Sequence, residues 1–292
     1  MTARFSLTRL LQCTHVIAFF LFLYLPIVML IIYSFNDNAT SMMSWNGFTF
    51  DWYLRVLVNL GIIAPESGLA GATNLQLYSD PNLSAAAKNS VIVAISASSL
   101  ATVIGTSTAL GLARTRFKGR TAYRTLLFLP IVIPDIVLGI ALLVFMASIS
   151  FPLGRISVII AHTVFLASYV NVVVGARLAG MDERLEEASA DLGANRWTTF
   201  RRITLPLLMP GIAGGFLLSL VISFDDLVIA YFTSGVGSTT LPVYLFGAIK
   251  RNVSPEINAV SVLMILISTT IAMAALLLRR KNADPGQGNN IA

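Results

Sequence analysis

Residues 14–35 read THVIAFFLFLYLPIVMLIIYSF and contain no Asp, Glu, Lys or Arg. A helix needs about 20 mostly apolar residues to cross the roughly 30 Å of hydrocarbon in a bilayer. This stretch meets that length, and five further stretches do the same, at 86–113, 121–147, 154–178, 207–232 and 256–278. The sequence therefore predicts an all-α integral membrane protein with six transmembrane helices.

The composition agrees with a membrane protein. Of the 292 residues, 56% are hydrophobic and only 12% are charged, with a formal net charge of +6. A soluble domain carries about 25% charged residues, so the low charge excludes disorder, a coiled coil and an ordinary soluble enzyme. We expect one transmembrane domain over residues 1–292, ending in a polar tail at 280–292. A single cysteine and two histidines exclude an internal disulfide and argue against a metal site.

The placement of the basic residues predicts the orientation of the chain. Fifteen of the 20 Lys and Arg residues lie at the amino terminus, in the second and fourth loops, or in the tail. Basic loops are retained in the cytoplasm, so both termini are predicted to lie there. The first span lacks a signal-peptidase cleavage pattern and is expected to remain uncleaved. Because topology accounts for the basic excess, a nucleic-acid partner is not expected.

Small residues recur every four positions in two spans and predict close packing of those helices. They are Ala97, Ala101, Gly105, Ala109 and Ala113 in the second span, and Gly211, Gly215 and Ser219 in the fifth. On the external side, the region 36–85 carries Trp45, Trp52 and Tyr53, which suit a membrane interface. It also includes an irregular stretch at 61–82. A short helix is expected to begin near Leu241, and Ser254-Pro255-Glu256 is a typical start for the sixth span.

The loop at 181–206 is polar and strongly patterned. Asp182 is placed to cap a helix with Leu185, Ala188, Ser189 and Leu192 on one side, and Gly193 is placed to end it. Asn195 is then placed to cap a second helix that carries Trp197, Phe200 and Ile203. The acidic polar face of the first helix disfavours binding to an anionic lipid surface. We therefore expect a helix-turn-helix that docks on another protein.

The same loop resembles the EAA motif of the membrane subunits of ATP-binding-cassette (ABC) importers. The residues that carry the resemblance are Glu187, Ala188, Ser189, Gly193, Ile203, Leu205 and Pro206. Their spacing matches throughout, and the one departure is Ser189, which stands where the second alanine is usual. The resemblance implies the type I ABC importer permease fold, also called MetI-like.

The resemblance also implies how the chain works. In that family the loop is a coupling helix that fits a cleft on a cytoplasmic ATPase dimer. The implied assembly has a second homologous permease, more often a distinct chain than a second copy, and a periplasmic substrate-binding protein, all at the bacterial inner membrane. This chain has no Gly-x4-Gly-Lys-Ser/Thr phosphate loop, so we expect no bound cofactor, with ATP and Mg on the partner ATPase. The chain itself is then a non-catalytic subunit.

Four further segments are similar to the spermidine/putrescine permease branch: Pro130 to Asp135, Phe224 to Val228, Thr239 to Pro242, and Ser254 to Ala259. The resemblance implies import of putrescine- or spermidine-like amines by alternating access. Permeases for other organic amines or opines share parts of these segments and remain the alternative. An ion-coupled secondary transporter is a more remote alternative, because it has no need of a docking loop.

Three carboxylates lie in or near apolar spans: Asp135, Asp225 and Asp226. A buried charge is costly in a bilayer, so such residues usually face a protein interior or a wet cavity. Helical geometry places Asp226 on the small-residue face and Asp225 to the other side. Carboxylates on the pathway would attract the ammonium groups of a polyamine. Their alternative role is to cap broken helices, and for Asp135 to cap a helix that restarts after Pro134.

An intramembrane aspartyl protease is disfavoured, because no Gly-x-Gly-Asp sequence surrounds Asp225.

Overall fold

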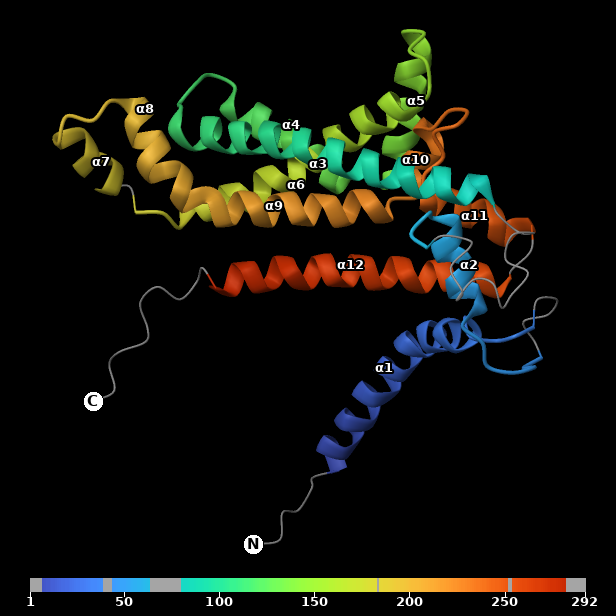
Figure 1. Ribbon diagram of the computed structural model, residues 1–292. Coiled ribbons are helices and arrows are strands. Elements are labelled where there is room, and N and C mark those ends of the chain that lie inside the picture. The colour runs from blue at the N-terminus through green and yellow to red at the C-terminus, as the bar shows by residue number, and fades with distance from the viewer. Residues whose placement is uncertain (1–6, 39–43, 64–79, 183, 252–253, 282–292) are drawn as a thin grey trace, which may run out of the picture. The chain divides into compact units, whose positions relative to one another are not determined.

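The computed structural model describes residues 7–38, 44–63, 80–182, 184–251 and 254–281. Within these ranges the regular elements are helices, and the only strand-like pairing is an isolated bridge between Asn36 and Phe48 (Figure 1). The chain divides into two compact units, one formed by 1–81 and 245–265 and the other by 82–244 and 266–292. The predicted all-α membrane class is confirmed.

Five helices of the described chain are long and apolar enough to cross a membrane. A sixth span is reached if one sharply bent helix pair is counted as one crossing. The five helices correspond to five of the predicted spans, with different ends: α1 (Leu7–Tyr33), α3 (Pro81–Arg114), α6 (Arg155–Ala179), α9 (Leu205–Asp225) and α12 (Pro255–Lys281). The predicted start of the sixth span at Pro255 agrees with α12. The tail beyond residue 281 lies outside the described residues.

The third predicted span, 121–147, is not one straight helix. It consists of α4 (Arg120–Val132) and α5 (Asp135–Ser148), which are bent by 110° relative to each other. A proline disfavours the helical conformation at the residue before it, and Ile133 and Pro134 are both extended, with ψ of 132° and 135°. Asp135 is the first residue of α5, where an acidic side chain favours the start of a helix.

The fifth predicted span, 207–232, is also broken. Helix α9 ends at Asp225, and the chain continues into the short helix α10 (Val228–Thr233). Asp226 lies between them in an extended conformation, with φ of −68° and ψ of 124°. The apolar pattern runs through both helices, which is why the sequence predicted a single span.

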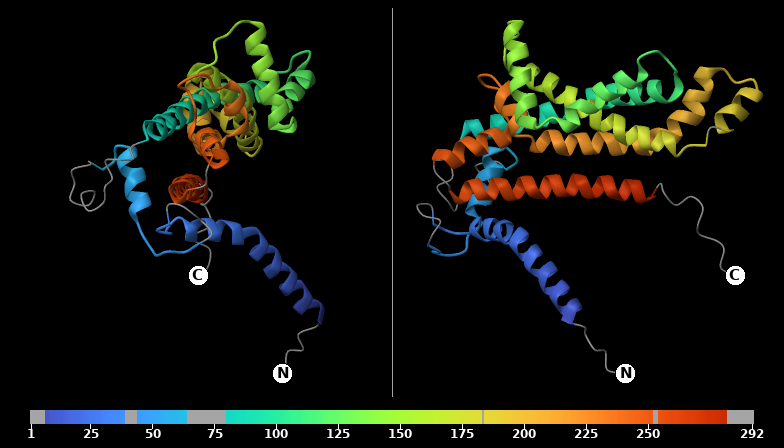
Figure 2. Two further views of the ribbon diagram at one scale, coloured as in Figure 1. Left: turned by 90° about the vertical axis from the view of Figure 1, so that its right-hand side faces the viewer. Right: turned by 180° about the vertical axis from the view of Figure 1, so that it is seen from behind.

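The core of the second unit is built around α6 and α9, which lie side by side (Figure 2). Val170 on α6 is fully buried, and an added Cβ at Gly105 of α3 or Gly215 of α9 would contact it. The predicted small-residue faces are therefore confirmed as packing faces, with Ala113 exposed at the end of the α3 series. Close approach of the backbones is what these residues contribute.

A segment at 234–240 joins α10 to α11 (Leu241–Arg251), which begins where the sequence predicted. Hydrogen bonds fasten this segment to α3. The Asn89 side-chain amide donates to the carbonyl oxygens of Gly237 and Thr239, each at 3.0 Å, and the Ser90 hydroxyl accepts from the Leu241 N–H at 2.7 Å. The connection is thus held to the amino-terminal part of α3 by side chains.

In the first unit, α2 (Asp51–Asn59) is held by Trp52. This side chain is buried, with 6% of its surface exposed, and its indole N–H donates to the Asn36 carbonyl oxygen at 2.8 Å. Trp52 therefore packs within the unit, whereas the sequence suggested a membrane interface. Trp45 remains half exposed. Of the stretch predicted to be irregular, residues 64–79 lie outside the described residues, and α3 begins at Pro81.

We predict that Gly105→Ala destabilises the second unit. A Cβ at this position would lie 2.7 Å from both the Ala167 carbonyl oxygen and the Val170 Cβ. Overpacking of this kind costs about 1–3 kcal/mol, so the midpoint of thermal unfolding of the purified chain should fall. Gly111→Ala on the same helix is the matched control, since its Cβ would meet nothing within 4 Å. Equal midpoints for the two variants would contradict the packing described above.

Candidate functional site

The loop between α6 and α9 forms the expected helix-turn-helix. Helix α7 (Arg184–Asp191) begins after Asp182, whose carboxylate accepts a hydrogen bond from the Arg184 N–H at 3.0 Å. Gly193 ends it with φ of +80°, a conformation that suits glycine. The Asn195 side chain accepts from the Thr198 N–H at 2.8 Å and caps α8 (Arg196–Thr199). The caps predicted from the sequence are therefore present.

The second helix runs without a gap into the fifth span. After α8 the backbone widens into one π-helical turn, η2 (Phe200–Thr204), and continues as α9. Pro206 follows this turn and has no N–H to donate to a helical carbonyl. Ile203 and Leu205 are half buried, whereas Pro206 is exposed. The helical backbone is therefore continuous from α8 into the membrane span.

Ser189 joins the two helices of the loop. It is buried, with 8% of its surface exposed, and its hydroxyl lies 2.9 Å from the Thr199 hydroxyl of α8. An alanine at this position would fit the space but would leave Thr199 without this bond. The departure from the usual motif thus adds a polar link between α7 and α8.

Glu186 fastens the loop to the membrane helices. Its Oε1 accepts a hydrogen bond from Arg114 Nη2 at the end of α3, at 2.6 Å, and one from the Thr204 hydroxyl before α9, at 2.7 Å. The Arg114 and Glu186 side chains are 32% and 23% exposed, so water only partly screens the pair. We call this group of Arg114, Glu186 and Thr204 the Glu186 clasp. The sequence predicted an acidic polar face for this helix but no partner for Glu186, because no local pattern signals a residue 72 positions away.

The neighbouring residues point out of the unit. Glu187 and Ala188 are exposed, and two large apolar side chains are strongly exposed, Leu192 at 89% and Trp197 at 68%. The Trp197 ring stacks on Phe200 with centroids 5.7 Å apart, which keeps it in place. Exposed apolar side chains beside a polar rim are typical of a protein interface. The arrangement is suited to docking a partner.

Asp226 is engaged at the break between α9 and α10. Its Oδ2 accepts a hydrogen bond from the Ala230 N–H at 2.8 Å and lies 3.2 Å from His162 Nε2. The Asp226 side chain is 9% exposed and the His162 side chain is fully buried, with its Nδ1 2.8 Å from the Ser223 hydroxyl. Asp226 therefore faces inward as expected and caps α10. The sequence did not indicate that His162 lies beside it.

Asp225 and Asp135 are placed differently from Asp226. Asp225 is exposed, and its Oδ1 accepts from the Ser268 hydroxyl of α12 at 2.8 Å. Asp135 is exposed at the first residue of α5 and forms no ion pair or side-chain hydrogen bond with another described residue. Among the described residues, the three carboxylates share no hydrogen-bond partner. The structure places all three at the two helix breaks.

Comparison with solved structures identifies the class of fold. The chain matches a chain of the bacterial alginate ABC transporter, solved with an alginate-bound periplasmic protein, with a TM-score of 0.65, 18% identity and 96% of each chain covered. It also matches a chain of the methionine ABC transporter MetNI with a TM-score of 0.55 and 21% identity, covering 66% of this chain and 93% of that one. The fold is that of type I ABC importer permeases, as expected.

Comparison of sequences identifies the family. Residues 101–283 match the binding-protein-dependent transport system inner membrane component. The chain is 38% identical to the spermidine/putrescine transport system permease protein PotC of Haemophilus influenzae, covering 89% of this chain and 93% of that one. It is 36% identical to the putrescine transport system permease protein PotI of Escherichia coli, covering 84% and 82%. The chain belongs to this family of multi-pass inner-membrane permeases.

We predict that Glu186→Ala loosens the loop while Glu187→Ala leaves it ordered. A hydrogen bond to a charged group contributes roughly 1.5–3 kcal/mol, so loss of the Glu186 clasp should speed amide exchange of α7 and α8 by about ten-fold or more. Hydrogen–deuterium exchange of the full chain in nanodiscs measures this. Glu187 is the matched control, because it is adjacent, exposed and outside the clasp. Equal exchange in the two variants would show that the clasp does not hold the loop.

We predict that Asp226→Ala lowers stability and that Asp226→Asn largely preserves it. An asparagine oxygen still accepts from the Ala230 N–H, whereas alanine removes the cap at a cost of about 1 kcal/mol. Thermal unfolding of the purified chain separates the variants. If asparagine were as destabilising as alanine, the charge beside His162 would be the dominant interaction and not the cap.

Proposed function

We propose that this chain is a permease subunit of an ATP-driven importer of polyamines, the putrescine- and spermidine-like cationic amines. The observation that carries the proposal is the similarity to spermidine/putrescine permeases, at 38% identity over 89% of this chain. A second permease of this kind, from Escherichia coli, is 35% identical over 96% of the chain. Such coverage includes both the loop and the broken spans, where substrate and partner contacts would lie.

The loop would couple the chain to an ATPase. Its outward face, with Glu187, Leu192 and Trp197, would dock in a cleft of the cytoplasmic ATPase dimer. The Glu186 clasp and the continuous backbone from α8 to α9 would then pass each movement to α3 and α9. In this proposal Gly193 sets the angle between the two loop helices. ATP and Mg bind the partner, and this chain remains non-catalytic.

The two helix breaks would provide the cation pathway. Broken membrane helices commonly mark substrate sites, because their unpaired backbone groups line a cavity. The carboxyl-terminal ends of α4 and α9 carry partial negative charge, which favours a cation. Asp135 and Asp225 add exposed carboxylates beside these ends, and Asp226 stabilises the second break. An exposed carboxylate in an apolar span is costly against lipid, which supports a wet pathway or a second permease there.

We extend the proposal to the assembly, as the family resemblance implies it. A second homologous permease, distinct from this chain, would complete the pathway, and a periplasmic binding protein would deliver the substrate. Both termini would lie in the cytoplasm, because most basic residues lie on that side of the predicted topology. The docking loop then faces the ATPase.

The test is putrescine uptake by the complete importer in proteoliposomes. Uptake should require ATP, and Asp225→Asn should reduce it by about ten-fold or more, since a hydrogen bond to a charged group contributes roughly 1.5–3 kcal/mol. Basal ATPase activity should persist, because Asp225 lies far along α9 from the loop. Asp37→Asn, at an exposed carboxylate outside the spans, is the control and should retain uptake.

Two outcomes would contradict the proposal. Uptake driven by an ion gradient without the ATPase would identify a secondary transporter. ATP-dependent uptake of another amine or an opine, with no response to putrescine or spermidine, would retain the importer and reject the polyamine substrate.

A further inference from the structure

A cavity of about 470 Å³ opens in the second unit between α3, α4 and α6. Its walls come from the carboxyl-terminal parts of α3 and α6 and from the first three turns of α4, so it lies at the end of the unit that carries the loop at 181–206 (Figure 1). Most of its lining is apolar. The two charged residues in the lining are Arg120 and Arg124, both on α4.

The two arginines are held in place. Arg120 Nη2 donates a hydrogen bond to the Leu112 carbonyl oxygen at 2.7 Å. The Arg124 guanidinium lies over the Phe128 ring, 5.8 Å from its centroid. The first contact uses one of the five guanidinium N–H donors and the second uses none, so most donors of both groups remain available.

The charges of these arginines are not balanced within the described chain. Neither guanidinium forms a salt bridge with a described carboxylate, and the nearby Arg114 is paired with Glu186. Like charges four residues apart on a helix repel each other. An anion between them would relieve this repulsion and accept charge-assisted hydrogen bonds from both. The same charges make the cavity unfavourable for a polyamine.

The surroundings of the cavity indicate an anion that carries an apolar part. Leu112, Phe128 and Val172 contribute to the lining. Beyond the arginines, α4 continues with exposed apolar side chains: Leu126 at 63%, Leu129 at 45% and Val132 at 79%. A free inorganic anion would make no use of this apolar surface, whereas an acyl chain lying along α4 would cover it.

We propose that this cavity binds the headgroup of an anionic phospholipid, with Arg120 and Arg124 on the phosphate and an acyl chain along α4. Basic pockets between membrane helices on the cytoplasmic side are suited to such headgroups. The assignment to the cytoplasmic leaflet rests on the orientation given under the proposed function. The cavity and its charges do not depend on that orientation. A bound lipid would link α4 to α3 and α6 beside the docking loop.

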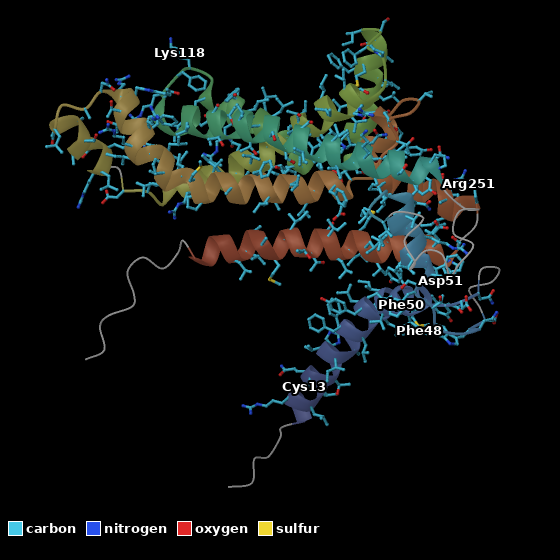
Figure 3. The ribbon with its side chains drawn as sticks, in the orientation of Figure 1. Cys13, Phe48, Phe50, Asp51, Lys118 and Arg251 are labelled. Carbon is cyan, nitrogen blue, oxygen red and sulfur yellow. The ribbon has the colours of Figure 1, made fainter. Side chains whose placement is uncertain are left out.

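Photoaffinity labelling tests this site. The full chain, in phosphatidylcholine nanodiscs containing a small fraction of photoactivatable phosphatidylglycerol, should be labelled on the cavity-lining parts of α3, α4 and α6. Each basic residue near an anionic lipid contributes roughly a five-fold preference, so the double variant R120Q/R124Q should lose labelling by about 25-fold. Lys118→Gln is the matched control, because Lys118 projects from the turn before α4 and does not line the cavity (Figure 3).

Four results would overturn the proposal. Equal labelling by photoactivatable phosphatidylcholine would show that the cavity does not require an anionic lipid. This comparison uses the wild-type chain, so it is valid even if R120Q/R124Q fails to fold. A folded R120Q/R124Q with unchanged labelling would exclude the arginines. An equal loss in Lys118→Gln would indicate general surface charge. Competition by inorganic phosphate would assign the cavity to a free anion.

Discussion

A backbone that crosses hydrocarbon must satisfy its own hydrogen-bonding groups, because no water is there to do so. Long helices meet this requirement in α1, α3, α6, α9 and α12. Two predicted spans are interrupted, one between α4 and α5 and one between α9 and α10. At each interruption, backbone groups need another hydrogen-bond partner. At the second break the Asp226 carboxylate accepts the Ala230 N–H that would otherwise lack a partner. At the first, Asp135 stands at the restart of the helix.

The two broken spans contact each other. The restarted helices α5 and α10 pack against each other, and Gly139 of α5 lies against Phe232 of α10. The helix that follows each break therefore packs against the helix that follows the other. Buried His162 on α6 then supports the second break through Asp226 and Ser223. Two buried polar side chains, His162 and Ser223, thus lie beside the second break.

At the opposite end of the second unit, polar contacts hold the loop at 181–206. The Glu186 clasp connects α7 to α3 and to the start of α9, and Ser189 connects α7 to α8. These contacts point inward, whereas Glu187, Leu192 and Trp197 remain at the surface. The loop therefore has one side attached to the membrane helices and one exposed side, as the proposed docking on a partner would require.

Several of these features follow from local sequence and were predictable. Each span is an apolar run of sufficient length, and the caps at Asp182, Gly193 and Asn195 involve residues only a few positions apart. The break after Pro134 was open as an alternative, because proline acts on its immediate neighbour. The break at Asp226 was less evident, since the apolar pattern continues across it and the deciding hydrogen bond depends on the backbone path.

The sequence by itself determined the membrane class, the number of apolar segments, the helix-turn-helix loop and the family resemblance, because these depend on composition and short spacing. Only the tertiary structure decided which carboxylates form hydrogen bonds and which are exposed. It also decided that Glu186, and not Glu187, pairs with Arg114. The cavity that Arg120 and Arg124 share with α6 likewise depends on how the helices pack. Those pairings join residues from different helices. Their energies depend on distance, burial and desolvation, which are set when the helices pack. A periodic sequence pattern therefore does not predict them.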